Sequence, residues 1–147
     1  MQKKSVRGFT LIEILIVIGI IAILAGVVLV AINPARQFAQ ANNSQRTSNV
    51  NAILNAVGQY IADTKGALPS EITTSTTTLS KAGIDLCNEL VPNYLPSLPV
   101  DPPITTGAVT DCASNYNTNY GVVRDANNRV TVVATSSQLN QTIEVTR

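Results

Sequence analysis

Histidine is absent from this sequence, and so is tryptophan. The lack of histidine excludes Ser-His-Asp and Cys-His catalysis. The sequence also contains no glycine-rich phosphate loop and no cluster of metal ligands. Catalysis by carboxylates alone would need a pair of acids, and no pair stands out among the nine Asp and Glu residues. We therefore expect a protein that is not an enzyme and has no cofactor. A membrane-anchored enzyme is the disfavoured alternative.

Charge is also scarce, and the formal net charge is only +1. Three of the basic residues, Lys3, Lys4 and Arg7, precede a long apolar run. Without them, seven basic residues face nine acidic ones, so the rest of the chain has a net charge near −2. This balance provides no basic surface of the kind that binds nucleic acid. We expect no specific nucleic-acid partner.

One segment, the run Leu11–Ile32, is apolar apart from Glu13, which carries its only charge. The run is long enough to span a bilayer, which takes about 20 apolar residues. It is too long for the apolar region of a cleaved secretory signal, and no such cleavage site follows it. The basic residues before the run should stay in the cytoplasm, which places the C-terminal part outside the membrane. About a hundred residues remain for one small core.

Glu13 is unexpected in a spanning helix, where a carboxylate costs about 2.5–3.5 kcal/mol. One interpretation is that Glu13 lies near the cytoplasmic interface and reaches water. The other is that it has a functional partner.

Residues 8–13 read Gly-Phe-Thr-Leu-Ile-Glu, with basic residues before them and the apolar run after them. This junction resembles the prepilin leader of type IV pilins and pseudopilins. The resemblance implies that a prepilin peptidase cuts between Gly8 and Phe9 and that Phe9 becomes N-methylated. It also implies that Glu13 pairs with the free amine of a neighbouring subunit during assembly.

The helix is expected to continue beyond the apolar run, with Pro34 as a point of weakness. Residues 40–49, rich in Asn, Gln and Ser, predict a solvated neck. An amphipathic stripe follows at helical spacing, formed by Val50, Ile53, Leu54, Val57 and Ile61. Lys65 and Gly66 are typical of a helix end. We expect a leader at residues 1–8, a spanning helix at 9–32, an amphipathic helix at 33–65 and a globular head at 66–147.

The head should hold a small antiparallel sheet packed on the stripe, giving an α+β pilin fold. Residues 70–80, rich in Ser and Thr, predict a surface loop, and residues 84–91 a short helix. Strands are predicted at 120–124, 129–135 and 141–145, with a turn at 125–128. Cys87 and Cys112 lie in the part expected outside the membrane, which favours a disulfide over two free thiols.

Residues 98–102 read Leu-Pro-Val-Asp-Pro. This string resembles the segment before the sheet in many pilins and in the major pseudopilin of type II secretion, where a nearby loop binds calcium. Asp101 and Asp111 could supply oxygen ligands, but two carboxylates without a ligand-spaced cluster favour a turn-capping role instead. We expect no metal site.

The resemblance implies a structural subunit of a type IV pilus-like extracellular filament, serving adhesion, motility or DNA uptake. Its partners would be further copies of itself, the prepilin peptidase, the pilus assembly machinery and the cytoplasmic membrane before assembly. The alternatives are a pseudopilin of a type II secretion system and a solitary membrane-anchored binding module. Before assembly the head would be extracytoplasmic, and after assembly the subunit would belong to an extracellular pilus.

Overall fold

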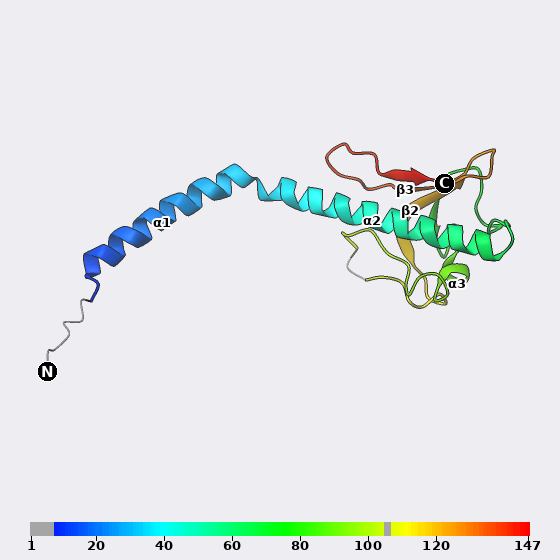
Figure 1. The fold of residues 1–147 in the computed structure, drawn as a ribbon, viewed down its shortest axis with the longest axis horizontal. Helices are drawn as coiled ribbons and strands as arrows, with labels where there is room; N and C mark the ends of the chain where they lie inside the picture. Colours follow the sequence, from blue (N-terminus) through cyan, green and yellow to red (C-terminus); the bar gives the residue numbers. More distant parts are fainter. Residues whose placement is uncertain (1–7, 105–106) are drawn as a thin grey trace. The chain divides into compact units, whose positions relative to one another are not determined.

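The computed structural model describes residues 8–104 and 107–147. The chain divides into two compact units, Met1–Phe38 and Ala39–Arg147. Figure 1 shows the helices and strands in chain order. The leader residues Lys3, Lys4 and Arg7 lie outside the described residues.

The first helix, α1, covers Leu11–Ile32 and has no buried residue. Apart from Glu13 in the first turn, its side chains are apolar on every side, so it has no polar face to turn toward water. By length and composition α1 can cross a membrane. The expected apolar helix is thus present.

The second helix, α2, covers Pro34–Asp63. A single residue, Asn33, separates it from α1 and adopts a left-handed backbone conformation with a φ of 48°. Asparagine tolerates this conformation better than most residues. Pro34 fits the first helical position, where no backbone donor is needed. The side chain of Asn33 accepts a hydrogen bond from the Arg36 amide at 3.3 Å. The weak point at Pro34 is therefore a local break that ends one helix and begins the next.

The end of α2 agrees with the prediction at Lys65 and Gly66. The Gly66 amide donates to the Ile61 carbonyl at 2.7 Å, and the Lys65 amide donates to that of Ala62 at 3.3 Å. These two bonds form a Schellman motif. Lys65, with a φ of 58°, occupies the left-handed position that glycine usually takes.

The head contains one antiparallel sheet in the order β1-β2-β3-β4. Its strands are Thr77–Ser80, Asn117–Arg124, Val130–Ala134 and Glu144–Thr146. A short helix, α3, covers Cys87–Leu90 within the segment predicted to be helical. The α+β fold class is confirmed.

Strand β1 corrects the prediction that residues 70–80 form a surface loop. Thr77 pairs with Val122 and Thr78 with Gly121 on β2. Leu79, one residue further, is completely buried. Threonine is β-branched and suits a strand as well as a loop. The Ser- and Thr-rich composition therefore predicted an exposed loop where the chain forms the edge strand β1.

The core lies between α2 and the sheet, and Figure 1 shows α2 running alongside β2 and β3. Four of the five predicted stripe residues are buried, and Ile61 is partly buried. The largest fully buried sheet residues are Tyr120, Leu79, Val122 and Val130.

The prediction of a solvated neck at residues 40–49 is wrong. Asn43, Arg46 and Asn49 are all buried, and Arg46 is only 1% exposed. Their spacing of three residues places them on one helix face that runs toward Val50. The buried face of α2 is thus polar at its N-terminal end, before the apolar stripe starts at Val50, and apolar spacing does not reveal this part.

Candidate processing and assembly segment

The predicted cleavage bond, between Gly8 and Phe9, lies outside regular secondary structure. Both residues are exposed, and nothing lies within 4 Å of where a Cβ on Gly8 would be. Helix α1 begins only at Leu11. The bond is therefore accessible and free of helical hydrogen bonding, as a protease substrate must be.

Thr10 and Glu13 form a capping box at the start of α1. The Glu13 amide donates to Thr10 Oγ1 at 3.3 Å. In return the Thr10 amide donates to Glu13 Oε2 at 3.4 Å. Two backbone donors that the first helical turn would leave unsatisfied are thereby paired.

The capping box gives Glu13 an intramolecular role that the sequence-based account did not include. Thr-x-x-Glu before an apolar run is a readable capping signal, so the information was present in the sequence. The carboxylate lies at the positive end of the helix dipole. It accepts from the amide of Thr10, the residue that follows Phe9, where a cut after Gly8 would create an amine.

The head contains a disulfide between Cys87 and Cys112, with the two Cα atoms 5.4 Å apart. This is the alternative that the sequence favoured. Asp85 lies beside it, accepting from Lys81 Nζ at 2.7 Å and from the Tyr116 hydroxyl at 2.6 Å. Lys81 Nζ also donates to the Cys112 carbonyl at 2.9 Å. These polar contacts join the segment after β1 to both sides of the disulfide.

The same contacts shift the pKa values of Asp85 and Tyr116. Burial tends to raise the pKa of Asp85, but hydrogen bonds from Lys81, Tyr116 and the Cys87 amide outweigh it and lower the pKa. Burial and the Asp85 carboxylate together raise the pKa of Tyr116. Tyr116 therefore stays a neutral donor to an ionised Asp85.

Asp101 and Asp111 have different roles. Asp111 caps a turn, because its carboxylate accepts from the Ala113 amide at 2.9 Å and from the Ser114 hydroxyl. The Ser114 and Ala113 bonds lower the pKa of Asp111. Asp101 is buried, and among the described residues its side chain caps no turn. It accepts from Arg46 Nε at 2.6 Å. The turn-capping prediction holds for Asp111 and is wrong for the Asp101 side chain.

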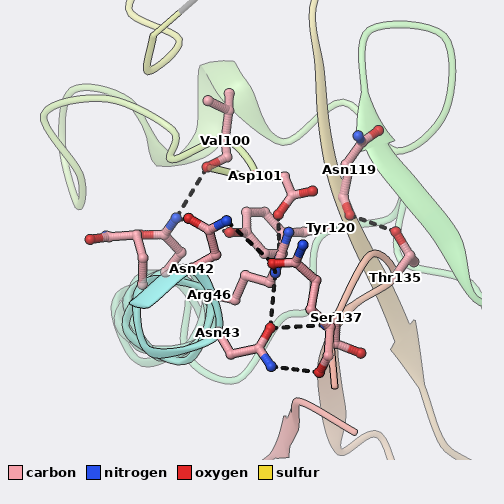
Figure 2. Close-up of polar contacts among 12 residues, drawn as sticks. Asn42, Asn43, Arg46, Val100, Asp101, Asn119, Tyr120, Thr135 and Ser137 are labelled. Atoms are coloured by element: carbon pink, nitrogen blue, oxygen red, sulfur yellow. Dashed lines mark hydrogen bonds and ion pairs between the residues drawn. The ribbon is translucent and has the colours of Figure 1, made fainter. Parts of the chain in front are cut away.

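Arg46 links Asp101 to a wider buried polar cluster on α2. Its Nη1 donates to Asn43 Oδ1 at 2.9 Å. Asn49 Nδ2, one helix turn further, donates to the Tyr120 hydroxyl at 2.9 Å. Figure 2 shows Arg46 and Asn43 on α2 pointing toward Asp101 and toward the segment after β3. Each buried polar group named here has a partner, as burial in a low-dielectric interior requires. Over residues 8–104 and 107–147, no group of three or more His, Cys, Asp or Glu side chains could hold a metal ion.

Comparison with known proteins identifies the N-terminal segment. Residues 3–29 match the family model described as the prokaryotic N-terminal methylation motif. No curated protein and no solved structure matches the chain. The match includes Gly8, Phe9, Glu13 and most of α1, and it leaves out the head. The chain therefore carries, at residues 3–29, the prokaryotic N-terminal methylation motif, the class III signal of type IV pilins and pseudopilins.

Proposed function

We propose that this chain is a structural subunit of a type IV pilus-like extracellular filament. The observation that carries the proposal is the methylation motif at residues 3–29, which overlaps a helix whose surface is apolar everywhere except at Glu13. A prepilin peptidase would cut between Gly8 and Phe9 and methylate the amine of Phe9. The leader, residues 1–8, would be lost.

The surface of α1 supports an assembly role. None of its 22 residues is buried within the chain. So much apolar surface is unfavourable in water and needs lipid or other protein around it. A single-pass membrane anchor satisfies this need before assembly, and packing among copies of α1 satisfies it afterwards. The same surface thus serves both states of the subunit.

Glu13 supplies the polar contact of this proposal. In the isolated chain its carboxylate accepts from the Thr10 amide. In the filament it would pair with the methylated amine of Phe9 on a neighbouring copy. A charged pair in an apolar surrounding is costly to break, because either partner alone is left uncompensated. The pair would therefore favour one axial register between subunits.

The head is proposed to lie outside the membrane, where the Cys87–Cys112 disulfide is stable. A pseudopilin of a type II secretion system would use the same processing and the same α1. The two functions differ in location, because a pilus subunit is recovered in long fibres at the cell surface. A solitary binding module would form no fibre at all.

The test is electron microscopy of filaments sheared from cells that produce the chain, labelled with an antibody against the head. The proposal predicts fibres labelled along their length. A variant that lacks Leu11–Ile32 is expected to form none. Label that stays on the cell envelope, with unlabelled fibres or none, would contradict the proposal.

A further inference from the structure

The connection between β3 and β4, residues 135–142, contributes no side chain to the core. Its side chains are exposed, except for the half-buried Ser137. The flanking residues Ala134 and Ile143 are both buried. Apolar burial therefore fixes the two ends of this segment and nothing between them.

Hydrogen bonds hold the segment. At its start the Thr135 hydroxyl donates to the Asn119 carbonyl on β2 at 2.7 Å, and further along Arg46 Nη1 on α2 donates to Gln138 Oε1 at 3.3 Å. Asn43 Nδ2 donates to the Gln138 carbonyl at 2.7 Å, and the Gln138 amide donates to Asn43 Oδ1 at 3.0 Å. The amide group of Asn43 thus pairs with the backbone of Gln138 as a neighbouring strand would. Asn43 Nδ2 also donates to Gln141 Oε1 at 2.7 Å, and Asn42 Nδ2 donates to Gln138 Oε1 at 3.2 Å. Figure 2 shows Asn43 pointing from α2 toward this segment.

The tip of the segment is strained. Leu139 and Asn140 both adopt left-handed backbone conformations, with φ values of 59° and 54°. The Gln141 amide closes the turn by donating to the Gln138 carbonyl at 3.2 Å. Such a turn favours Asn or Gly at its first central position, and leucine is disfavoured there. Leu139 is 44% exposed, so burial of its side chain offsets little of this strain.

We propose that residues 135–142 form a strap that opens and closes on α2 as a unit, while the sheet and the disulfide-linked core stay folded. Opening exposes almost no apolar surface, and water replaces the hydrogen bonds that are lost. It also releases the strained backbone of Leu139. Arg46 keeps its bond to Asp101 in the open state, so opening leaves no uncompensated charge. The open strap exposes the side-chain amide of Asn43, which in the closed state is hydrogen-bonded to the backbone of Gln138.

Amide hydrogen exchange on the full-length chain in detergent micelles tests this proposal. The Gln138 and Gln141 amides are expected to exchange roughly 100-fold faster than the paired amides of β3, through an opening that denaturant hardly affects. Asn43→Ala should speed their exchange by about tenfold and leave β3 unchanged. Asn51→Ala is the matched control, because Asn51 lies on the same helix and its side chain donates only to the Thr47 carbonyl.

A second variant acts on the strap without touching Arg46. Leu139→Asn places a residue that accepts the left-handed conformation at the tip. It should stabilise the closed strap and slow exchange of the same two amides by about threefold. Exchange of both amides at the β3 rate, with the same dependence on denaturant, would overturn the proposal. Faster exchange in Leu139→Asn would also overturn it.

Discussion

Glu13 combines two roles that can be separated by experiment. As a hydrogen-bond acceptor it caps α1 through the Thr10 amide. As a charge it is proposed to meet an amine on another copy. Glutamine retains an acceptor at the capping-box position but has no charge. Alanine has neither.

We predict that Glu13→Gln and Glu13→Ala both leave cleavage after Gly8 largely intact and both reduce filament yield by about tenfold or more. The reason is that the loss of charge, rather than the loss of the cap, removes the contact between subunits. Immunoblotting measures cleavage, and the amount of sheared fibre measures assembly. Normal fibres from Glu13→Gln together with few fibres from Glu13→Ala would assign the effect to capping.

Arg46 and Asp101 form an ion pair whose contribution to the stability of the fold depends on both partners being present. Both side chains are almost completely buried. Arg46→Met would leave a buried carboxylate without its cation, at a cost of about 3–5 kcal/mol in the free energy of unfolding. The double variant Arg46→Met/Asp101→Leu should recover much of that loss, because it removes both charges. Chemical unfolding of the chain in micelles measures both variants. A double variant as unstable as the single one would show that the packing of Arg46, and not its charge, is what matters.

At the scale of elements, the disulfide links α3 to the loop that precedes β2. The two cysteines are 25 residues apart in sequence. Closing a loop of that length stabilises a fold by about 3.5 kcal/mol in the chain-entropy model. Reduction is therefore expected to lower the thermal unfolding temperature of the head by several degrees or more. Differential scanning fluorimetry with and without reductant measures the change, and an unchanged midpoint would contradict this account.

The contacts of Asp85 beside the disulfide make this region sensitive to acid. The folded-state pKa of Asp85 lies below the ordinary aspartate value of 3.8. Its contribution to stability is therefore present above that pH and is lost as the pH falls through the folded-state pKa. Asp85→Asn should flatten the dependence of unfolding on pH below about 4. Asp63→Asn is a suitable control, because Asp63 is exposed and lies at the far end of α2. Equal pH dependence in the wild type and in Asp85→Asn would contradict the prediction.

The elements also show how far the sequence could be read. The apolar stripe of α2 and strands β2 and β3 follow from periodicity and lie close to their predicted positions, whereas β4 begins at Glu144, three residues after its predicted start. Strand β1 was missed because threonine is common both in loops and in edge strands. The polar face of α2 at Asn43, Arg46 and Asn49 was missed because burial was read from apolar spacing alone. Their partners lie about 50 to 95 residues away in sequence, and local patterns do not reveal such pairings.

At the scale of the whole molecule, the two units meet different requirements. Residues 3–29 match the methylation motif, and α1 has an apolar surface that the chain itself does not cover. The head satisfies its own core with α2, four strands and one disulfide. An N-terminal unit with an uncovered apolar surface, followed in the chain by a head with its own core, supports the proposed filament subunit.

The central claim is that the chain is cut after Gly8 and methylated on the new N-terminus. Intact-mass and peptide mass spectrometry of the subunit recovered from sheared fibres tests it most directly. We expect a chain that begins at Phe9, carries one N-methyl group and retains the Cys87–Cys112 disulfide. A subunit that still begins at Met1 would contradict it.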